Sequence, residues 1–574
     1  MRFLCYTEMD QTTIASNLGD ADYSYYFVQQ AFLPLLKTLG DVELVHSVDE
    51  QLPSLVEKAL HIDGDCVLLA FAPPHKVPEN PGCPVIPVFA WEYSTLPNQQ
   101  FIDNPRDNWS HVLAECGQAI THSSYALQTV HSAIRSDFPV ASLPAPIWDY
   151  FQEQRDKAPA RQARKSINLP LNATIIDSAA FNIDSETIFP ASTVSSYFDS
   201  DEKQSTWNSD VFTVSLGVKE PGVFPIGFYD PEGWGAWSKS SSPWIMMPIV
   251  FSGKIVLTIC ASAYGKNIGR KIKIRVGSTT KELILGSTPE EQTIRLDITK
   301  PTNYICFFDL DLSDERSAAD PRSLGIGITS ISIEADQQTG KKQETIENAP
   351  PEKNILPLDG VIYTSILNPK DGRKNWEDIL TGFCLAFREN KDATLILKMT
   401  YKDLSAYLDD IFALFCQLHP FSCRVVVIHG YIDDEDYNSL IDATSFIVNA
   451  SRCEGQCLPL MEYMSSGVPA IAPNNTAMKD YVNENNSFIV DSTPEPIYWP
   501  HDPRQVFRTL WYRPNWESLY NAYLDSYNIA INSPERYQQL SIAAIESLRL
   551  FCSAETLKPK LEKLLESTLN SNNR

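Results

Sequence analysis

The 574-residue sequence lacks the features that would place it among membrane-spanning, secreted or repetitive proteins. It has no run of about 18 or more apolar residues, so we expect no transmembrane helix. Its first residues, MRFLCYTEMDQTT, include an acidic residue and no basic segment ahead of a long apolar stretch, so we expect no signal peptide. Nothing repeats at the period of a solenoid. The length instead indicates several globular domains.

Positive charge is also scarce. The chain has 47 Lys and Arg residues against 72 Asp and Glu, which gives a formal net charge of −25. Such a surface repels nucleic acids and anionic membranes, so we expect no nucleic-acid partner and no broad membrane-binding face. A small basic pocket remains compatible with this balance.

The cysteines form no compact framework. The 12 of them are scattered from Cys5 to Cys552, which indicates reduced thiols and a cytoplasmic location. Cys453 and Cys457 lack a second His or Cys pair at zinc-site spacing, and their separation does not fit a redox motif. We therefore expect no metal site.

Two parts of the chain alternate strand-like and helix-like segments. Apolar runs such as DCVLLAFAPP and VVVIHGYI are separated by helical patterns such as YYFVQQAFLPLLKTLG. This alternation predicts parallel sheets covered on both faces, so we expect α/β domains at residues 1–160 and 355–545. No G-x-G-x-x-G follows the first strand, which argues against a nicotinamide-dinucleotide site.

Residues 165–340 have a different pattern. Strands such as KIKIRVGS and QTIRLDIT follow one another without intervening helices and alternate apolar with polar residues. They predict an antiparallel β-sandwich inserted between the two α/β domains. We expect a polar exit linker at residues 337–354, and a helical tail at 546–574 that can pack back on the N-terminal domain.

The stretch SRCEGQCLPLMEYMSSGVPAIAPNN, residues 451–475, is the most informative. It predicts a loop after a strand, then a helix that has Pro459 in its first turn and stops at Gly467, then another strand. Such a loop lies at the carboxyl edge of a parallel sheet, where open α/β folds bind ligands. The helix N-terminus would favour an anion through the N–H groups of Gly455, Gln456, Cys457 and Leu458.

Two carboxylates flank this helix start. Glu454 and Glu462 are eight residues apart, which is roughly 12 Å along a helix axis. This is on the order of the distance between the sugar and the ribose of a nucleotide-sugar, and the amides between the glutamates would meet its diphosphate. Taken alone, each glutamate is better explained structurally: a Glu just before a helix often serves as a cap or dipole partner, and one within a helix often faces solvent.

The same residues resemble the signature of retaining family 4 glycosyltransferases of the GT-B fold, whose usual form is E-G-x-G-L-P-x-x-E-A-M-x-x-G-x-P-V-I-A. The departures are Cys457, where a second glycine is usual, and Tyr463, where alanine is usual. The resemblance implies two Rossmann-like domains that face a cleft, a UDP-, GDP- or dTDP-sugar donor, no cofactor and no metal. It places Glu462 on the ribose, and Glu454 with the following amides on the transferring sugar.

Candidate catalytic residues also lie outside this stretch. Lys370, Arg373 and Lys374 cluster in a strand-to-helix loop and suit a diphosphate leaving group, although a solvated basic loop is the alternative. The family has an Arg directly after the strand, and here Arg373 would replace it. Glu92 ends a strand beside the expected cleft, where similar enzymes place a His. It would bind acceptor hydroxyls or assist deprotonation, or else be a buried, paired carboxylate.

Weaker candidates for acceptor or sugar contact are His122, at another strand end, and Gly19, in the loop NLGDADYSYYF. A satisfied core histidine is the alternative for His122. In the sandwich, GFYDPEGWGAWSKSSSPW resembles an uncharacterised domain that accompanies bacterial glycosyltransferases and membrane-bound glycan-modifying proteins. Its tryptophans would either stack on sugars or seal the core.

The predicted function is that of a bacterial retaining hexosyltransferase acting on a glycan or lipid-linked acceptor in lipopolysaccharide O-antigen or capsule biosynthesis. A non-catalytic nucleotide-sugar or glycan-binding scaffold, and a GT-B-fold epimerase or phosphorylase, remain as alternatives. The expected location is the cytoplasm, either free or at the inner face of the cytoplasmic membrane beside other polysaccharide-assembly proteins.

Overall fold

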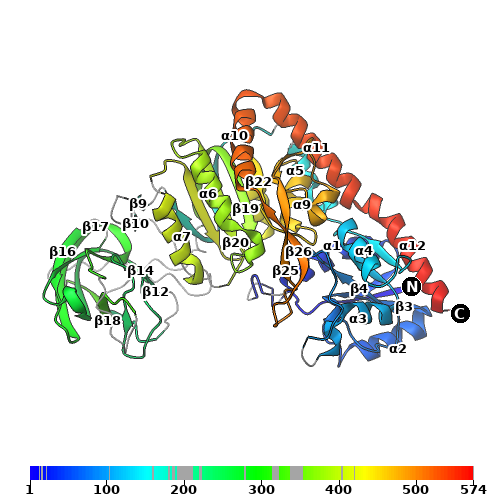
Figure 1. Ribbon diagram of the computed structural model, residues 1–574, viewed down its shortest axis with the longest axis horizontal. Helices are drawn as coiled ribbons and strands as arrows, with labels where there is room; N and C mark the ends of the chain where they lie inside the picture. Colours follow the sequence, from blue (N-terminus) through cyan, green and yellow to red (C-terminus); the bar gives the residue numbers. More distant parts are fainter. Residues whose placement is uncertain are drawn as a thin grey trace, which may run out of the picture.

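The computed structural model describes residues 1–572 with gaps at 12, 15–16, 21, 102–103, 158–160, 179–180, 184–187, 191–210, 219–222, 277–278, 313–321, 337–352, 403–404 and 419. Most of the predicted exit linker therefore lies outside the described residues. Figure 1 shows an antiparallel β unit, a central α/β domain and an N-terminal α/β domain, with the last helices running along the N-terminal domain.

The N-terminal domain is a parallel sheet with helices on both faces. Its strands are β1 (Arg2–Tyr6), β2 (Asp41–Val45), β3 (Cys66–Phe71), β4 (Val85–Phe89), β5 (Ala119–Thr121) and β6 (Val140–Ser142), in the order β2-β1-β3-β4-β5-β6. The described helices between them are α1 (Tyr23–Lys37), α2 (Leu52–Asp63), α3 (Trp109–Cys116) and α4 (Ser124–Ala133), and α5 (Gln152–Lys157) follows β6. Every residue of β3 and β4 is buried, as their continuous apolar sequence requires.

The C-terminal domain repeats this architecture. Its parallel strands are β19 (Asn354–Leu367), β20 (Ala393–Met399), β21 (Arg424–His429), β22 (Phe446–Val448), β23 (Ala470–Ala472) and β24 (Ser487–Ile489), in the order β24-β23-β22-β19-β20-β21. The described helices that alternate with them are α6 (Trp376–Ala386), α7 (Ser405–Leu418), α8 (Asp434–Ala443) and α9 (Leu458–Ser465). The α/β class is thus confirmed, with two parallel-sheet domains as expected for a GT-B fold.

The border between the sandwich and the C-terminal domain differs from the expected one. We expected residues 165–177 in the sandwich, but β7 (Arg164–Leu171) pairs antiparallel with β19, and β8 (Thr174–Asp177) pairs with β21. Leu169 and Leu171 are fully buried in the C-terminal core. Apolar alternation identifies a strand but not the sheet that it joins, and these two strands enter the C-terminal sheet before the chain leaves it.

The inserted unit is antiparallel throughout its described strands. They are β11 (Phe212–Ser215), β12 (Phe224–Ile226), β13 (Ala236–Trp237), β14 (Trp244–Ala263), β15 (Lys271–Val276), β16 (Thr279–Ile284), β17 (Glu290–Phe308) and β18 (Ile326–Ala335). The alternation predicted for KIKIRV is confirmed, because Ile272, Ile274 and Val276 are buried in its own apolar core. A short hairpin of β9 (Phe181–Ile183) and β10 (Ile188–Pro190) precedes the unit.

A hairpin and a run of helices complete the chain. The hairpin consists of β25 (Ser492–Tyr498) and β26 (Phe507–Pro514), and the helices are α10 (Trp516–Asn532), α11 (Pro534–Cys552) and α12 (Ala554–Asn572). α12 runs along the N-terminal domain (Figure 1), and its Leu557 and Leu561 are fully buried in an apolar cluster that includes the core of that domain. No helix in the described ranges combines the length and apolarity needed to cross a bilayer.

The loop before α1 closes against the C-terminal domain at Gly19. Its carbonyl oxygen accepts a hydrogen bond of 2.7 Å from Asn368 Nδ2, which follows β19. The residue has φ +74°, and a Cβ built on it would lie 2.0 Å from the carbonyl oxygen of Thr400, which follows β20. Both the backbone conformation and the close approach therefore require glycine at this interdomain contact.

Gly19→Ala is expected to destabilise the chain more than Gly117→Ala. Gly117 has the same φ of +74°, but its Cβ would meet nothing within 4 Å, so that control carries only the backbone cost of about 1 kcal/mol. The clash with Thr400 should add about 1–3 kcal/mol at position 19, measured by urea or thermal unfolding. Equal effects of the two substitutions would mean that the Gly19 loop does not press on Thr400 in solution.

Candidate active site

The loop between β22 and α9 forms one wall of the cleft, and its local geometry follows the sequence. Pro459 lies in the first turn of α9, where its missing N–H is not needed. The helix ends at Ser465, and Gly467 has φ +84°, so the expected stop is confirmed. Cys457, which departs from the usual glycine, has φ +62° and therefore adopts the left-handed conformation that glycine accommodates more easily.

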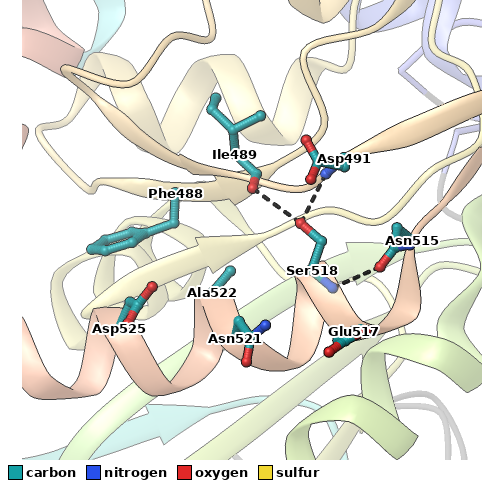
Figure 2. A pocket seen from close by; sticks show the side chains of 9 residues that line it. All are labelled: Phe488, Ile489, Asp491, Asn515, Glu517, Ser518, Asn521, Ala522 and Asp525. Atoms are coloured by element: carbon teal, nitrogen blue, oxygen red, sulfur yellow. Dashed lines mark hydrogen bonds between the residues drawn. The ribbon is translucent and has the colours of Figure 1, made fainter.

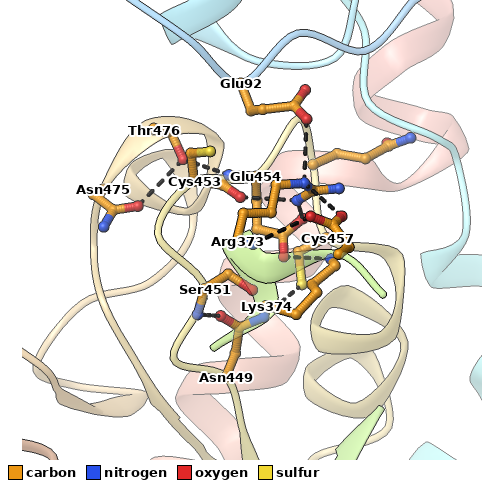
Figure 3. Close-up of polar contacts among 12 residues, drawn as sticks. Glu92, Arg373, Lys374, Asn449, Ser451, Cys453, Glu454, Cys457, Asn475 and Thr476 are labelled. Carbon is orange, nitrogen blue, oxygen red and sulfur yellow. Dashed lines mark hydrogen bonds and ion pairs between the residues drawn. The ribbon is translucent and has the colours of Figure 1, made fainter. Parts of the chain in front are cut away.

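Glu454 is bound on both carboxylate oxygens by the basic loop after β19 (Figure 3). Lys374 Nζ lies 2.6 Å from Oε1, and Arg373 Nη1 lies 2.8 Å from Oε2. The Glu454 side chain is only 3% exposed. Two loops that follow adjacent strands of one parallel sheet thus meet at its carboxyl edge, as the sequence predicted.

Arg373 extends this cluster across the cleft. Its Nε lies 3.3 Å from Oε1 of Glu92 and 2.8 Å from Oδ2 of Asp371. Its Nη1 also donates to the carbonyl oxygen of Cys453 at 2.9 Å. Glu92 belongs to the loop that follows β4 in the N-terminal domain. We call Glu92, Asp371, Arg373, Lys374 and Glu454 the cleft cluster. Asp371 was missed in the sequence, although its place just before GRK made it a candidate partner.

Burial and charge set the protonation of the cleft cluster. Burial alone would raise the pKa of Glu454, but Lys374 and Arg373 outweigh it and hold that pKa well below its usual range. Burial raises the pKa of Glu92, and Arg373 opposes that shift. Arg373 remains charged, because the surrounding carboxylates raise its pKa despite burial. Glu454 is therefore a fixed anion, whereas the pKa of Glu92 is shifted upward.

The backbone next to Glu454 is rich in unused donors. In the described part of the chain, no hydrogen bond involves the N–H groups of Gly455, Gln456, Cys457 or Leu458. Gln456 instead uses its carbonyl oxygen to accept from Tyr481 Oη at 2.8 Å, and its Oε1 accepts from Ala145 N at 3.1 Å. A Cβ on Gly455 would lie 2.7 Å from Cβ of Ala90, so the N-terminal domain closes directly over this loop.

Glu462 lies apart from the cleft cluster. It accepts a hydrogen bond from the hydroxyl of Tyr437 on α8, a partner that the sequence analysis missed because the two residues are distant in the chain. Burial raises the pKa of Glu462 to about 7, while the Tyr437 bond opposes the rise. The Glu462 carboxylate therefore titrates near neutral pH, unlike that of Glu454.

The remaining candidates take other positions. His122 is fully buried, and its Nδ1 lies 2.9 Å from the carbonyl oxygen of Leu143. Burial lowers its pKa to about 4, so its ring is neutral, and its role in sugar contact stays a prediction. Lys370 lies over the ring of Tyr401, 5.3 Å from its centroid, and not on Glu454, which Arg373 and Lys374 bind. Gly19 lies at the interdomain contact described above.

A separate hollow of about 390 Å³ lies beside β24 and α10 (Figure 2). It shares no residue with the cleft cluster. Its polar groups serve the start of α10, since Asn515 Oδ1 accepts from Ser518 N at 2.8 Å and Ser518 Oγ accepts from Asp491 N at 3.0 Å. We therefore treat it as part of a helix cap.

Metal ligands are not gathered anywhere in the described ranges, where no three His, Cys, Asp or Glu side chains form a group suited to a cation. Asp309, in the acidic pair DLD, is instead 3.0 Å from Lys273 Nζ. Asp433, in DDED, caps α8 by accepting from Asp436 N at 2.8 Å.

Two family models match the chain. Residues 409–498, from α7 to the end of β25, match the family described as "Glycosyl transferases group 1". Residues 200–335 match "Domain of unknown function (DUF7024)", which corresponds to the antiparallel unit. The first match includes Glu454 and Glu462, and the loop of Arg373 and Lys374 precedes it.

Curated relatives and solved structures give more limited similarities. "Phosphoglycerol transferase I" of Escherichia coli and of Shigella boydii is 29% identical over 133 residues, which is 22% of this chain and 17% of those proteins. A Staphylococcus aureus TarM mutant in complex with fondaparinux, alpha-GlcNAc-glycerol and UDP has a TM-score of 0.28 at 14% identity, over 39% of this chain and 38% of that one. The pneumococcal O-GlcNAc transferase GtfA, in complex with UDP and GlcNAc, has a TM-score of 0.27 at 15% identity, over 36% of each chain. The group 1 match, together with the two parallel-sheet domains, supports a glycosyltransferase.

Proposed function

We propose that the chain is a retaining glycosyltransferase that moves a hexose from a nucleotide-sugar to a glycan or lipid-linked acceptor without a metal ion. The observation that carries this proposal is the cleft cluster. It places two cations and the fixed carboxylate of Glu454 beside a row of unused backbone amides, at the carboxyl edge of the donor-side sheet. These are the groups that a diphosphate with a sugar on one side requires.

Donor binding would exchange the partners of Arg373 and Lys374. Both cations are paired with the Glu454 carboxylate in this structure. A diphosphate that accepts their hydrogen bonds releases the Glu454 carboxylate to accept from the sugar hydroxyls. The same cations then stabilise the charge that grows on the leaving phosphate, and the acceptor attacks from the face the phosphate leaves.

Glu92 is the residue best placed to act on the acceptor. It reaches the cluster from the N-terminal domain, and burial raises its pKa, which makes its carboxylate a stronger base. Glu462, in the middle of α9, would hold the ribose. The direct closure of Ala90 over Gly455 would exclude water from the transfer step.

The antiparallel unit supports a glycan acceptor through its half-buried tryptophans. Trp244 is only 4% exposed and belongs to the core, but Trp234 and Trp237 are partly exposed with ring centroids 5.3 Å apart. Both rings lie over Gly327, where a Cβ would come within 2.7 Å of Trp234. Glu232, which accepts from Trp234 Nε1 at 3.2 Å, adds a polar group beside the rings. Aromatic faces next to polar groups suit pyranose rings.

We further propose that this acceptor belongs to bacterial surface polysaccharide, as O-antigen or capsule, and that the chain works in the cytoplasm or at the inner face of the cytoplasmic membrane. The alternative of a non-catalytic binding scaffold is tested by the same experiment. The purified chain is incubated with UDP-, GDP- and dTDP-hexoses, and hydrolysis or transfer is followed by release of the nucleoside diphosphate. Absence of turnover with every donor, alongside tight glycan binding, would favour the scaffold.

Lys374→Met is expected to lower kcat/KM about 100-fold, since it removes one cation from the leaving diphosphate. Lys370→Met is the matched control, because Lys370 is in the same loop but contacts Tyr401 rather than Glu454. Its kcat/KM should stay within about threefold of the parent, since an exposed loop charge contributes little. Equal losses in the two variants would remove Lys374 from the proposed role.

Donor affinity is expected to rise with pH around neutrality. The Glu462 carboxyl has a pKa of about 7 and must be ionised to accept bonds from both ribose hydroxyls. Between pH 6 and pH 8 its ionised fraction rises about tenfold, and the affinity for the intact nucleotide-sugar, measured by calorimetry, should follow. Tyr437→Phe removes the bond that lowers this pKa, so its midpoint should move upward, whereas Glu462→Gln should abolish the dependence.

Trp234→Ala is expected to weaken glycan binding by about tenfold or more, since a stacking aromatic is lost. The measurement is affinity electrophoresis against a panel of soluble polysaccharides. Ile284→Ala serves as the control, because Ile284 is 51% exposed on β16 of the same unit. Unchanged retention of Trp234→Ala on every polysaccharide that retains the parent would exclude a platform at these rings.

A further inference from the structure

The β25–β26 hairpin, residues 492–514, reaches from the C-terminal domain to the N-terminal domain, and we call it the strap. Its base contacts the Glu454 loop. Tyr512 N donates to the carbonyl oxygen of Arg452 at 2.8 Å, and the Arg452 guanidinium lies 4.7 Å from the ring centroid of Trp511. Arg452 N in turn donates to the carbonyl oxygen of Arg373 at 2.8 Å. The strap is therefore attached directly to the backbone of the cleft cluster.

The other end of the strap holds the N-terminal domain through aromatic rings. Trp499 is 2% exposed and stacks on Phe101 with a centroid distance of 5.9 Å. His501 lies 5.3 Å from the ring of His75 and 6.0 Å from that of Trp109. These contacts bury Trp499 against the N-terminal domain, while His501 and residues 503–505 at the tip of the hairpin stay exposed.

Thr95 is the centre of the polar contacts between the strap and the N-terminal domain. Its N–H donates to Thr509 Oγ1 at 3.1 Å, and its Oγ1 donates to the carbonyl oxygen of Arg508 at 2.8 Å. Its carbonyl oxygen accepts from two indoles, Trp91 Nε1 at 3.0 Å and Trp499 Nε1 at 3.1 Å. Every hydrogen-bonding group of Thr95 is thus engaged, which fixes this loop against the strap.

Thr509 of the strap contacts two neighbouring residues of the Glu92 loop, Ser94 and Thr95. Its side chain is buried, and besides Thr95 N its Oγ1 meets Ser94 Oγ at 3.3 Å. Glu92 is three residues before Thr95 in the same loop, between the buried side chains of Trp91 and Tyr93. The loop is held by β4 on one side and by the strap on the other, so the Glu92 carboxylate has little freedom to leave Arg373.

We propose that Thr509 is a positioning residue, which acts through Thr95 to keep Glu92 on Arg373 so that the Glu92 loop moves with the donor-side domain. The strap belongs to the C-terminal, donor-side domain, yet it holds the Glu92 loop of the N-terminal, acceptor-side domain in place. The catalytic consequence rests on the proposed function, whereas the mechanical consequence does not. If the cleft opens to admit substrates, the Glu92–Arg373 contact stays closed and the domains separate at another place.

Hydrogen exchange of the intact chain tests the mechanical part. Thr509→Val keeps the side-chain shape and removes the hydroxyl, so exchange should become at least tenfold faster in peptides covering 91–96 and 371–376. Thr509→Ser keeps the hydroxyl and should match the parent in both. Glu92→Gln should speed exchange only in 371–376. Unchanged exchange at 371–376 in Thr509→Val, or faster exchange in Thr509→Ser, would overturn the proposal.

Kinetics with whichever nucleotide-sugar is turned over test the catalytic part. Thr509→Val should lower kcat about tenfold with the donor KM within twofold, and Thr509→Ser should restore kcat. In the Glu92→Gln background, Thr509→Val should cause no further loss, because its effect acts through Glu92. A full additional tenfold loss there would show that Thr509 only stabilises the fold. If no donor is turned over, the exchange experiment still decides the positioning role.

Discussion

The salt bridges of Glu454 with Arg373 and Lys374 are the interaction on which the arrangement of the cleft depends. Burying a carboxylate is costly unless opposite charges and hydrogen bonds compensate it, and here both oxygens are compensated at 2.6 and 2.8 Å. These bridges join loops that follow neighbouring strands of one sheet. Through Arg373 they also hold Glu92, so the same cation joins the two domains.

The sequence sufficed for features that depend on local pattern and on the geometry of parallel sheets. The loops of Arg373 and Glu454 follow strands β19 and β22, whose carboxyl ends share one edge, so their meeting was predictable. The stop of α9 before Gly467 required only the known preference of glycine for positive φ. The alternation in KIKIRV likewise predicted which side chains of β15 are buried.

Features that depend on contacts between distant segments could not be predicted. Nothing near Glu462 indicates that Tyr437 would donate to it, and nothing near Glu92 gives the relative placement of the two domains. The pairing of β7 and β8 with strands of the C-terminal sheet could not be predicted for the same reason, since the pattern of a strand does not identify the strand that it pairs with. The strap was missed because its two strands bury few residues of their own, and its partners Thr95, Phe101 and Trp109 belong to the other domain.

The pairing of β7 with β19 has a consequence for how the chain was assembled. Leu171, where β7 ends, is directly opposite Asn354, where β19 begins, and β8 is the described strand between these two points that also joins the C-terminal sheet. Apart from β8, the 182 residues between them replace what could be a simple reverse turn. A whole domain can be gained, exchanged or lost at such a junction while the strand order of the parent sheet is preserved. The antiparallel unit therefore adds to the chain without interrupting the strand order of the C-terminal sheet.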